Sequence, residues 1–144
     1  MRQLFLFIAI FLLGTATVVA EPSNFRVGAG AIKLDSQWGG ELFAEYPQNN
    51  HTASRFSLYY ANDDYRIKGV EAQLFWGIGL AEPGFRLYAG PSWHYEKTTK
   101  SDHAWALQLG TGWQYRAITL DYSVSARDRH ADVLVQRILF SYRF

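Results

Sequence analysis

The sequence contains no cysteine, so it can form neither a disulfide scaffold nor a thiolate metal site. It also lacks an excess of charge of either sign, with 14 Lys and Arg against 13 Asp and Glu. This balance excludes the strong basic field that non-specific nucleic-acid binding requires. A chain of 144 residues provides one domain with a core of its own. From this composition we expect no nucleic-acid partner and no cofactor.

A long apolar run occurs only at the beginning of the sequence. Leu4–Leu13 is uninterrupted, and Val18 and Ala20 occupy the −3 and −1 positions of a cleavage site. These features predict a secretory signal peptide over residues 1–20 and a mature domain over residues 21–144. The alternative is a retained N-terminal membrane helix. After residue 20 no apolar run is long enough for a spanning helix, so a membrane role would require a barrel or peripheral attachment.

Hydrophobic and polar residues alternate with a period of two through most of the remaining sequence. Residues two apart share one face of a β-strand, so each alternating segment predicts an amphipathic strand. Seven segments show the alternation, within residues 37–46, 54–60, 70–78, 85–96, 105–116, 118–127 and 134–144. An eighth, Phe25–Leu34, is weaker because Gly28 and Gly30 obscure its apolar face. No helical periodicity follows residue 20, so we expect an all-β protein.

The length and number of these segments are typical of a membrane barrel. Several continue for ten residues or more, whereas strands of soluble proteins have about five or six and tilted spanning strands about nine to eleven. Divided among eight strands, residues 21–144 leave about 15 residues for each strand and its connection, and bacterial barrels have even strand numbers from eight upward. We therefore predict an eight-stranded antiparallel up-and-down transmembrane β-barrel.

The two faces of the predicted strands differ in chemistry. The apolar face is rich in aromatic residues near strand ends, as the girdles of a membrane barrel are. The polar face carries charges of both signs, namely Glu41, Glu45, Arg55, Glu71, Arg86, Glu96, Asp121, Arg137 and Arg143. An eight-stranded barrel has room inside only for side chains, so these charges should pair in a closed lumen. A soluble lipocalin-like barrel with an apolar interior is the alternative that alternation alone leaves open.

The sequence ends with Arg137–Phe144, in which aromatic or aliphatic residues alternate before a terminal phenylalanine. This segment resembles the C-terminal signature of bacterial outer-membrane barrels. With the predicted signal peptide and strands, the chain resembles the small eight-stranded outer-membrane β-barrel superfamily, which includes the OmpA transmembrane domain, OmpX-like and Ail-like proteins and the lipid A deacylase PagL. The resemblance implies a monomer in the outer membrane of a Gram-negative bacterium. It also implies contact with lipopolysaccharide and recognition by the barrel-assembly machinery through the segment ending in Phe144.

The same resemblance implies that both termini lie in the periplasm. The extracellular connections would be residues 35–37, 61–65, 97–103 and 127–132, and the periplasmic ones residues 47–52, 80–84 and 116–118. The first extracellular connection is short, which argues against an adhesin because surface-adhesive members carry long loops.

One row of residues has the chemistry of an acyl hydrolase. Ser92, His94 and Glu96 alternate on one face and offer a nucleophile, a base and an orienting acid. Alternate residues of one strand are about 7 Å apart, so their side chains run parallel, and a polar network inside the barrel is the simpler interpretation. The PagL family carries His-x-Ser, whereas this sequence has Asp121 two residues before Ser123. With this motif incomplete, we assign no catalytic residue, and PagL-like lipid A hydrolysis remains an alternative function.

Other ligand sites have weaker support. The four histidines, His51, His94, His103 and His130, are scattered and lack ligand spacing, so no metal site is expected. The cations Lys97, Lys100, Arg127 and Arg129 suit lipid headgroups, because guanidinium and ammonium groups bind phosphate. The preferred function is a non-enzymatic barrel with a structural or lipid- and surface-interacting role, and a narrow porin is a further alternative.

Overall fold

The computed structural model describes residues 25–144 except 35, 62–66, 98–100 and 128–129, and leaves the side chains of 67, 101–102 and 130–133 undescribed. Eight strands follow one another along the chain: β1 (Arg26–Leu34), β2 (Gln37–Pro47), β3 (Thr52–Ala61), β4 (Ile67–Ile78), β5 (Gly84–Lys97), β6 (Ser101–Tyr115), β7 (Ile118–Arg127) and β8 (His130–Arg143). In the part of the chain described here, no helix is long and apolar enough to cross a membrane.

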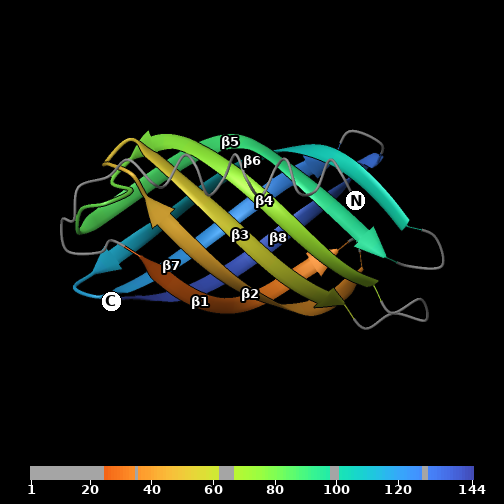
Figure 1. The fold of residues 1–144 in the computed structure, drawn as a ribbon, viewed down its shortest axis with the longest axis horizontal. Helices are drawn as coiled ribbons and strands as arrows, with labels where there is room; N and C mark the ends of the chain where they lie inside the picture. Colours follow the sequence, from red (N-terminus) through yellow and green to blue (C-terminus); the bar gives the residue numbers. More distant parts are fainter. Residues whose placement is uncertain (1–24, 35, 62–66, 98–100, 128–129) are drawn as a thin grey trace, which may run out of the picture.

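Each strand pairs antiparallel with the next, and β1 pairs with β8, so the sheet closes into a barrel (Figure 1). Arg26 lies opposite both Glu45 of β2 and Arg143 of β8 across these ladders. Closure removes the exposed sheet edges that an open sheet would leave. The predicted all-β fold, its strand number and its up-and-down order are therefore confirmed.

The barrel has two ends with different connections. At the terminal end, where β1 begins and β8 ends, residues 48–51, 79–83 and 116–117 join neighbouring strands. At the distal end, β5 continues to Lys97 and β7 to Arg127. The expected connections over 97–103 and 127–132 were too long, because the following strands begin at residues 101 and 130. The ladders continue past the apolar part of each strand, where sequence alternation gives little guidance.

Burial along the strands is the reverse of that in a soluble protein. Leu107 is 67% exposed and Trp113 59%, whereas Arg55 is completely buried and Glu45 is 1% exposed. Because side chains alternate across each strand, the apolar files cover the outside and the polar files line the interior. The predicted assignment of the two faces is confirmed, and the lipocalin-like alternative is wrong.

Aromatic side chains form a girdle on the outside at each end. The distal girdle contains Trp38, Tyr60, Tyr95 and Trp105, and the terminal girdle contains Trp76, Phe85, Trp113, Tyr115 and Tyr142, all of them exposed. On β6, Trp105 belongs to the distal girdle and Tyr115 to the terminal girdle, and the two residues are ten positions apart. At about 3.4 Å per residue and a tilt of about 40°, this span rises about 26 Å. Outer-membrane barrels carry an apolar band of about 25 Å.

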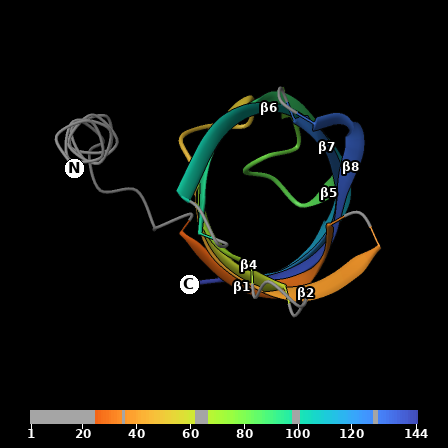
Figure 2. The same ribbon diagram turned by 90° about the vertical axis from the view of Figure 1, so that its right-hand side faces the viewer.

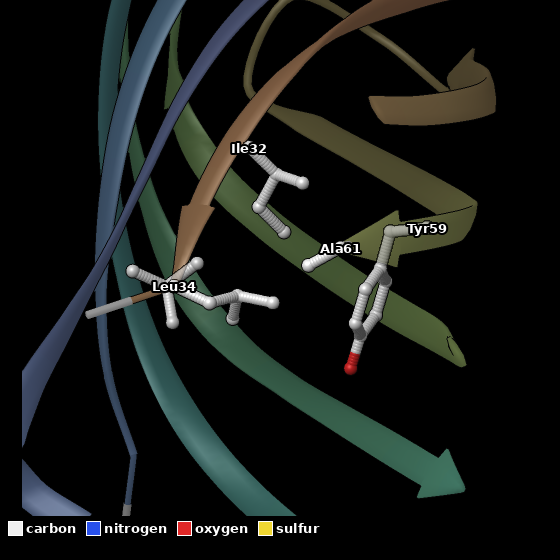
Figure 3. Packing of buried hydrophobic residues seen from close by; sticks show 5 residues of the cluster. Ile32, Leu34, Tyr59 and Ala61 are labelled. Atoms are coloured by element: carbon white, nitrogen blue, oxygen red, sulfur yellow. The ribbon is translucent and has the colours of Figure 1, made fainter. Parts of the chain in front are cut away.

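Small apolar clusters lie inside the barrel towards both ends. Near the distal end, Ile32, Leu34, Tyr59, Ala61 and Val135 pack together (Figure 3). Near the terminal end, a second cluster contains Ala53, Phe75, Leu80 and Tyr88. Large interior rings require glycine on neighbouring strands: a Cβ at Gly28 would lie 2.4 Å from the Phe43 ring, and one at Gly110 would lie 2.2 Å from the Tyr88 ring. Buried charged residues pack against both clusters, since Arg26 donates to the carbonyl of Leu80 and Glu96 accepts from the hydroxyl of Tyr59.

Candidate functional site: the charged interior

Glu45 is the centre of the largest ion-pair network among the described residues inside the barrel. Its carboxylate accepts hydrogen bonds from Arg26 at 2.7 Å, from Arg55 at 2.5 and 3.0 Å, and from Arg86 at 2.8 Å. Asp121 also pairs with Arg55 at 3.1 Å and with Arg86 at 3.3 Å. Five strands contribute these residues, so the network joins walls of the barrel that are distant along the sheet.

Aromatic rings surround the Arg55 guanidinium within this network. The centroids of the Phe43, Phe75 and Tyr88 rings lie 4.8, 5.0 and 5.6 Å from its Cζ atom. A guanidinium within about 6 Å of an aromatic face is attracted by the ring quadrupole, most strongly where water is excluded. Arg55 is therefore held by both carboxylates and rings, which fixes the position of its guanidinium beside the terminal cluster.

Arg137 of β8 forms a second network with two carboxylates. Its Nε donates to Glu41 at 3.0 Å, and another guanidinium nitrogen donates to Glu71. The remaining nitrogen donates to the hydroxyl of Ser125 at 3.0 Å. All four residues are buried. Since β2, β4, β7 and β8 supply them, this network also crosses the lumen.

A third network lies closer to the distal end. Glu96 accepts a hydrogen bond from the hydroxyl of Tyr59 at 2.6 Å and another from Arg127. The Tyr59 ring also belongs to the distal apolar cluster. This network therefore connects an ion pair of the lumen to the distal apolar cluster.

The three networks together contain equal numbers of arginines and carboxylates. The ion pairs involve five arginines and five acids, namely Arg26, Arg55, Arg86, Arg127, Arg137, Glu41, Glu45, Glu71, Glu96 and Asp121. Burying a charge is costly unless it is paired and hydrogen-bonded. The balance offsets the cost of burying these side chains, and their pairs hold strands to one another.

The connection over residues 79–83 folds into the terminal end of the barrel. Leu80 is completely buried, and its carbonyl accepts a hydrogen bond from Arg26 at 2.7 Å. Its amide donates to the carbonyl of Asn50 at 3.2 Å, and Arg143 donates to the carbonyl of Ala81 at 3.4 Å. Figure 2 shows this connection inside the ring of strands. Positive φ angles of 69° at Gly79 and 114° at Gly84 permit the inward turn.

The hydrolase candidates Ser92, His94 and Glu96 lie on the interior face of β5 but do not form a catalytic triad. Ser92 and His94 are 1% and 4% exposed. His94 lies opposite Glu71 in the β4–β5 ladder, whereas Glu96 bonds with Tyr59 and Arg127. A carboxylate held by a tyrosine and an arginine does not orient an imidazole, so the row fits the interior network.

The cations expected to bind headgroups lie in different surroundings. Lys97 is exposed at the end of β5, in register with Lys68 of β4. Arg127 is the last residue of β7 and is 8% exposed, because its guanidinium turns inward to Glu96. The expectation that Arg127 lies in a connection is wrong, because it belongs to β7 and its guanidinium bonds with Glu96. Lys100 and Arg129 lie outside the described residues.

The histidines do not form a metal site in the described part of the chain, where no group of three His, Asp or Glu side chains has suitable geometry. His51 lies at the terminal end against the carbonyl of Gly77, and His103 is exposed on β6. The side chain of His130 lies outside the described residues.

Arg26 and Leu80 are among the interior residues that were not identified from the sequence. Arg26 was missed because the glycines of β1 weaken its alternation, although two ladders place it between Glu45 and Arg143. Leu80 was missed because it lies in a connection. An apolar residue next to turn residues only weakly indicates a connection that folds inward. The inward position of Leu80 is identified by its hydrogen bonds with Arg26 and Asn50.

A closed eight-stranded barrel with a charged interior, an apolar exterior and two aromatic girdles has the architecture of a transmembrane β-barrel. The fold is similar to that of Ail from Yersinia pestis, solved in a phospholipid bilayer nanodisc, with a TM-score of 0.59 and 15% identity over 85% of this chain and 99% of that chain. It is also similar to the N-terminal β-barrel domain of OprF from Pseudomonas aeruginosa, with a TM-score of 0.63 and 9% identity over 86% of this chain and all of that chain. The sequence matches no protein-family model and no curated protein sequence. The likeness confirms the expected resemblance to small outer-membrane barrels at the level of the fold.

Proposed function

We propose that this protein is a non-enzymatic integral barrel of the bacterial outer membrane with a structural or lipid-interacting role. The observation that carries the proposal is the reversed burial, with Leu109 54% exposed and Glu45 1% exposed. Exposed apolar area of this extent in water would drive association, whereas in a bilayer it faces hydrocarbon. The height of the apolar band, about 26 Å, supports a spanning orientation.

The proposal places both termini on the periplasmic side. An even number of strands leaves the first and last strands open to the same end, where β1 begins and β8 ends. The lengths of the connections do not distinguish the two ends, because two residues separate β6 from β7 at the terminal end and also β1 from β2 at the distal end. The orientation is supported instead by the resemblance of the C-terminal segment Arg137–Phe144 to that of outer-membrane barrels. Cleavage of a signal peptide after Ala20 remains a prediction from the sequence.

The proposal also holds that the lumen is closed and does not conduct ions. The cross-lumen pairs of Glu45 and Arg137 and the inward connection at Leu80 support it. A porin needs a water-filled path, so planar-bilayer recordings of the purified barrel should show no stepwise conductance. Regular open-channel steps would favour the narrow-porin alternative.

A test of the membrane assignment uses one exterior substitution. Leu109→Arg puts a cation near the middle of the band, where an arginine costs about 2–4 kcal/mol in a membrane barrel. In a soluble protein, a substitution at an exposed position changes stability by less than about 0.5 kcal/mol. The free energy of unfolding is measured by denaturant titration in lipid vesicles, using the mobility difference between boiled and unboiled samples.

The matched control is Glu82→Arg, since Glu82 is exposed in the connection 79–83, outside the apolar band. We expect Leu109→Arg to lose stability and Glu82→Arg to retain it, with the unchanged protein found in the outer-membrane fraction. Equal stability of both variants, or recovery of the protein as a soluble periplasmic species, would refute the assignment.

A further inference from the structure

A groove runs across the outside of the barrel near its distal end. It has a volume of about 810 Å³ and is lined by residues of five neighbouring strands, β1 to β5, most of which face outward. Leu42, Leu58 and Val70 provide its apolar walls, and Tyr60 and Tyr95 lie on its distal side. Because these residues belong to the exterior that the proposed function places in lipid, the groove would open to acyl chains.

Small residues produce the hollow. Ala29 of β1 and Gly40 of β2 lie among larger exterior residues, and a Cβ added at Gly40 would meet no atom within 4 Å. By contrast, glycines such as Gly69 and Gly110 make room for interior rings. No packing contact inside the barrel therefore requires glycine at position 40. The missing side chain of Gly40 instead hollows the outer surface of the barrel.

Two lysines stand together at the distal edge of this groove. Lys68 and Lys97 are exposed, line the groove and lie directly opposite each other in the β4–β5 ladder. Like charges in such a pair are destabilising. Among the side chains that the structure describes on β4 and β5, the carboxylates of Glu71 and Glu96 do not relieve this repulsion, because they face inward and pair with Arg137 and Arg127. An anion between the ammonium groups would relieve it.

The lysine pair also lies at the depth where lipid headgroups are found. Lys68 is in register with Tyr60, and Lys97 is two residues beyond Tyr95, both members of the distal girdle. Aromatic girdles mark the interface between hydrocarbon and headgroups. The groove thus combines a place for an acyl chain with two cations at headgroup level.

We propose that this groove is a binding site for one anionic lipid, whose headgroup phosphate is not neutralised by a cation of the same headgroup, with an acyl chain over Gly40 and the phosphate between Lys68 and Lys97. The inference rests on the proposed membrane function and adds a specific lipid class and location to it. It retains Lys97 from the headgroup residues expected from the sequence and adds Lys68, which the register of β4 and β5 places opposite Lys97.

The experiment measures lipid binding to the full chain by native mass spectrometry from detergent. The probes are dioleoylphosphatidylglycerol, dioleoylphosphatidylcholine with the same acyl chains, and inorganic phosphate. We expect phosphatidylglycerol to bind more tightly than phosphatidylcholine, and inorganic phosphate to leave its binding unchanged at equal concentration. Efficient competition by inorganic phosphate would show that the acyl chain contributes nothing, and would overturn the lipid assignment.

Two variants separate the headgroup from the acyl chain. The double substitution Lys68→Gln and Lys97→Gln should weaken phosphatidylglycerol binding about thirtyfold, roughly fivefold for each lysine near the anionic surface, and leave phosphatidylcholine binding unchanged. Gly40→Leu, which fills the hollow from outside, should weaken the binding of both lipids. Lys33→Gln is the matched control, because Lys33 lies at the distal end, over the Trp38 ring and outside the groove.

Retention of the phosphatidylglycerol preference by the double variant, or an equal loss in Lys33→Gln, would overturn the proposal. Each preparation is also tested for the mobility shift on boiling and for insertion into vesicles. A variant that inserts normally but has lost no lipid preference contradicts the groove alone, whereas failure of the unchanged protein to insert contradicts the membrane function itself.

Discussion

Replacing Glu45 by glutamine should destabilise the barrel more than any single loss of an exposed charge. Glu45 pairs with Arg26, Arg55 and Arg86 at 2.5–2.8 Å. At a charge separation of about 4 Å and an effective dielectric constant of about 20, each pair contributes about 4 kcal/mol of attraction. Part of this total offsets the cost of burying the carboxylate, and removing one partner of a buried pair has a net cost of about 3–5 kcal/mol.

The assay is urea unfolding in phospholipid vesicles, followed by tryptophan fluorescence and by mobility before boiling. With a slope of about 2 kcal/mol per molar urea, the expected loss lowers the midpoint by about 1.5–2.5 M. Glu82→Gln is the control because Glu82 is exposed, and its midpoint should not move measurably.

A second substitution tests whether the loss comes from uncompensated positive charge. In Glu45→Gln, Asp121 still pairs with Arg55 and Arg86. Arg26 keeps its hydrogen bonds to the Leu80 carbonyl and to Gln114. Adding Arg86→Gln restores the charge balance and should recover part of the lost stability, giving a favourable coupling energy in the double-mutant cycle. A loss below 1 kcal/mol for Glu45→Gln, or additive effects of the two substitutions, would refute the reasoning.

Three further predictions concern the interior of the barrel, two of them its packing and one the hydrolase candidates. Gly110→Ala should cost about 1–3 kcal/mol in the same unfolding assay, because its Cβ would lie 2.2 Å from the Tyr88 ring, whereas Gly40→Ala, with nothing within 4 Å, should cost none of this overpacking energy. Leu80→Ala should cost about 2–5 kcal/mol, because Leu80 is completely buried against the terminal cluster; an unchanged midpoint would mean that the inward connection does not stabilise the barrel. Ser92→Ala and His94→Ala should leave the acylation of lipid A, measured by mass spectrometry of extracted lipid, the same as in cells with the unchanged protein. A difference in acylation that either substitution abolishes would instead support the hydrolase alternative.

Much of the architecture could be predicted because strand periodicity is a local property of sequence. On β4, alternation of Glu71 and Gln73 with Ala72 and Leu74 already separates the interior face from the exterior face. The same rule placed Arg55, Arg86 and Arg137 on the interior face, and the structure finds all three buried. Alternation failed to locate Arg26, since the glycines of β1 are consistent with either face.

The ends of strands were less predictable than their middles. Arg127 lies among charged residues that resemble a loop in sequence, yet it ends β7 and turns inward to Glu96. Beyond the apolar band, side chains on both faces are polar, so hydrophobic alternation no longer distinguishes strand from connection. Beyond the band, backbone pairing with the neighbouring strand determines where a strand ends. This pairing depends on residues that are distant in the sequence.

The sequence by itself determined the strand number, the order of the strands and the chemistry of the two faces, because a period of two fixes which side chains share a face. Only the tertiary structure decided which charges meet: Arg137 reaches Glu41 across 96 positions of sequence, and Arg26 reaches Gln114 across 88. The tertiary structure also places Leu80 inside the lumen and Lys68 opposite Lys97 at the edge of a groove. The physical reason is that closure of the sheet sets the distances across and around the barrel, and these distances depend on all eight strands together.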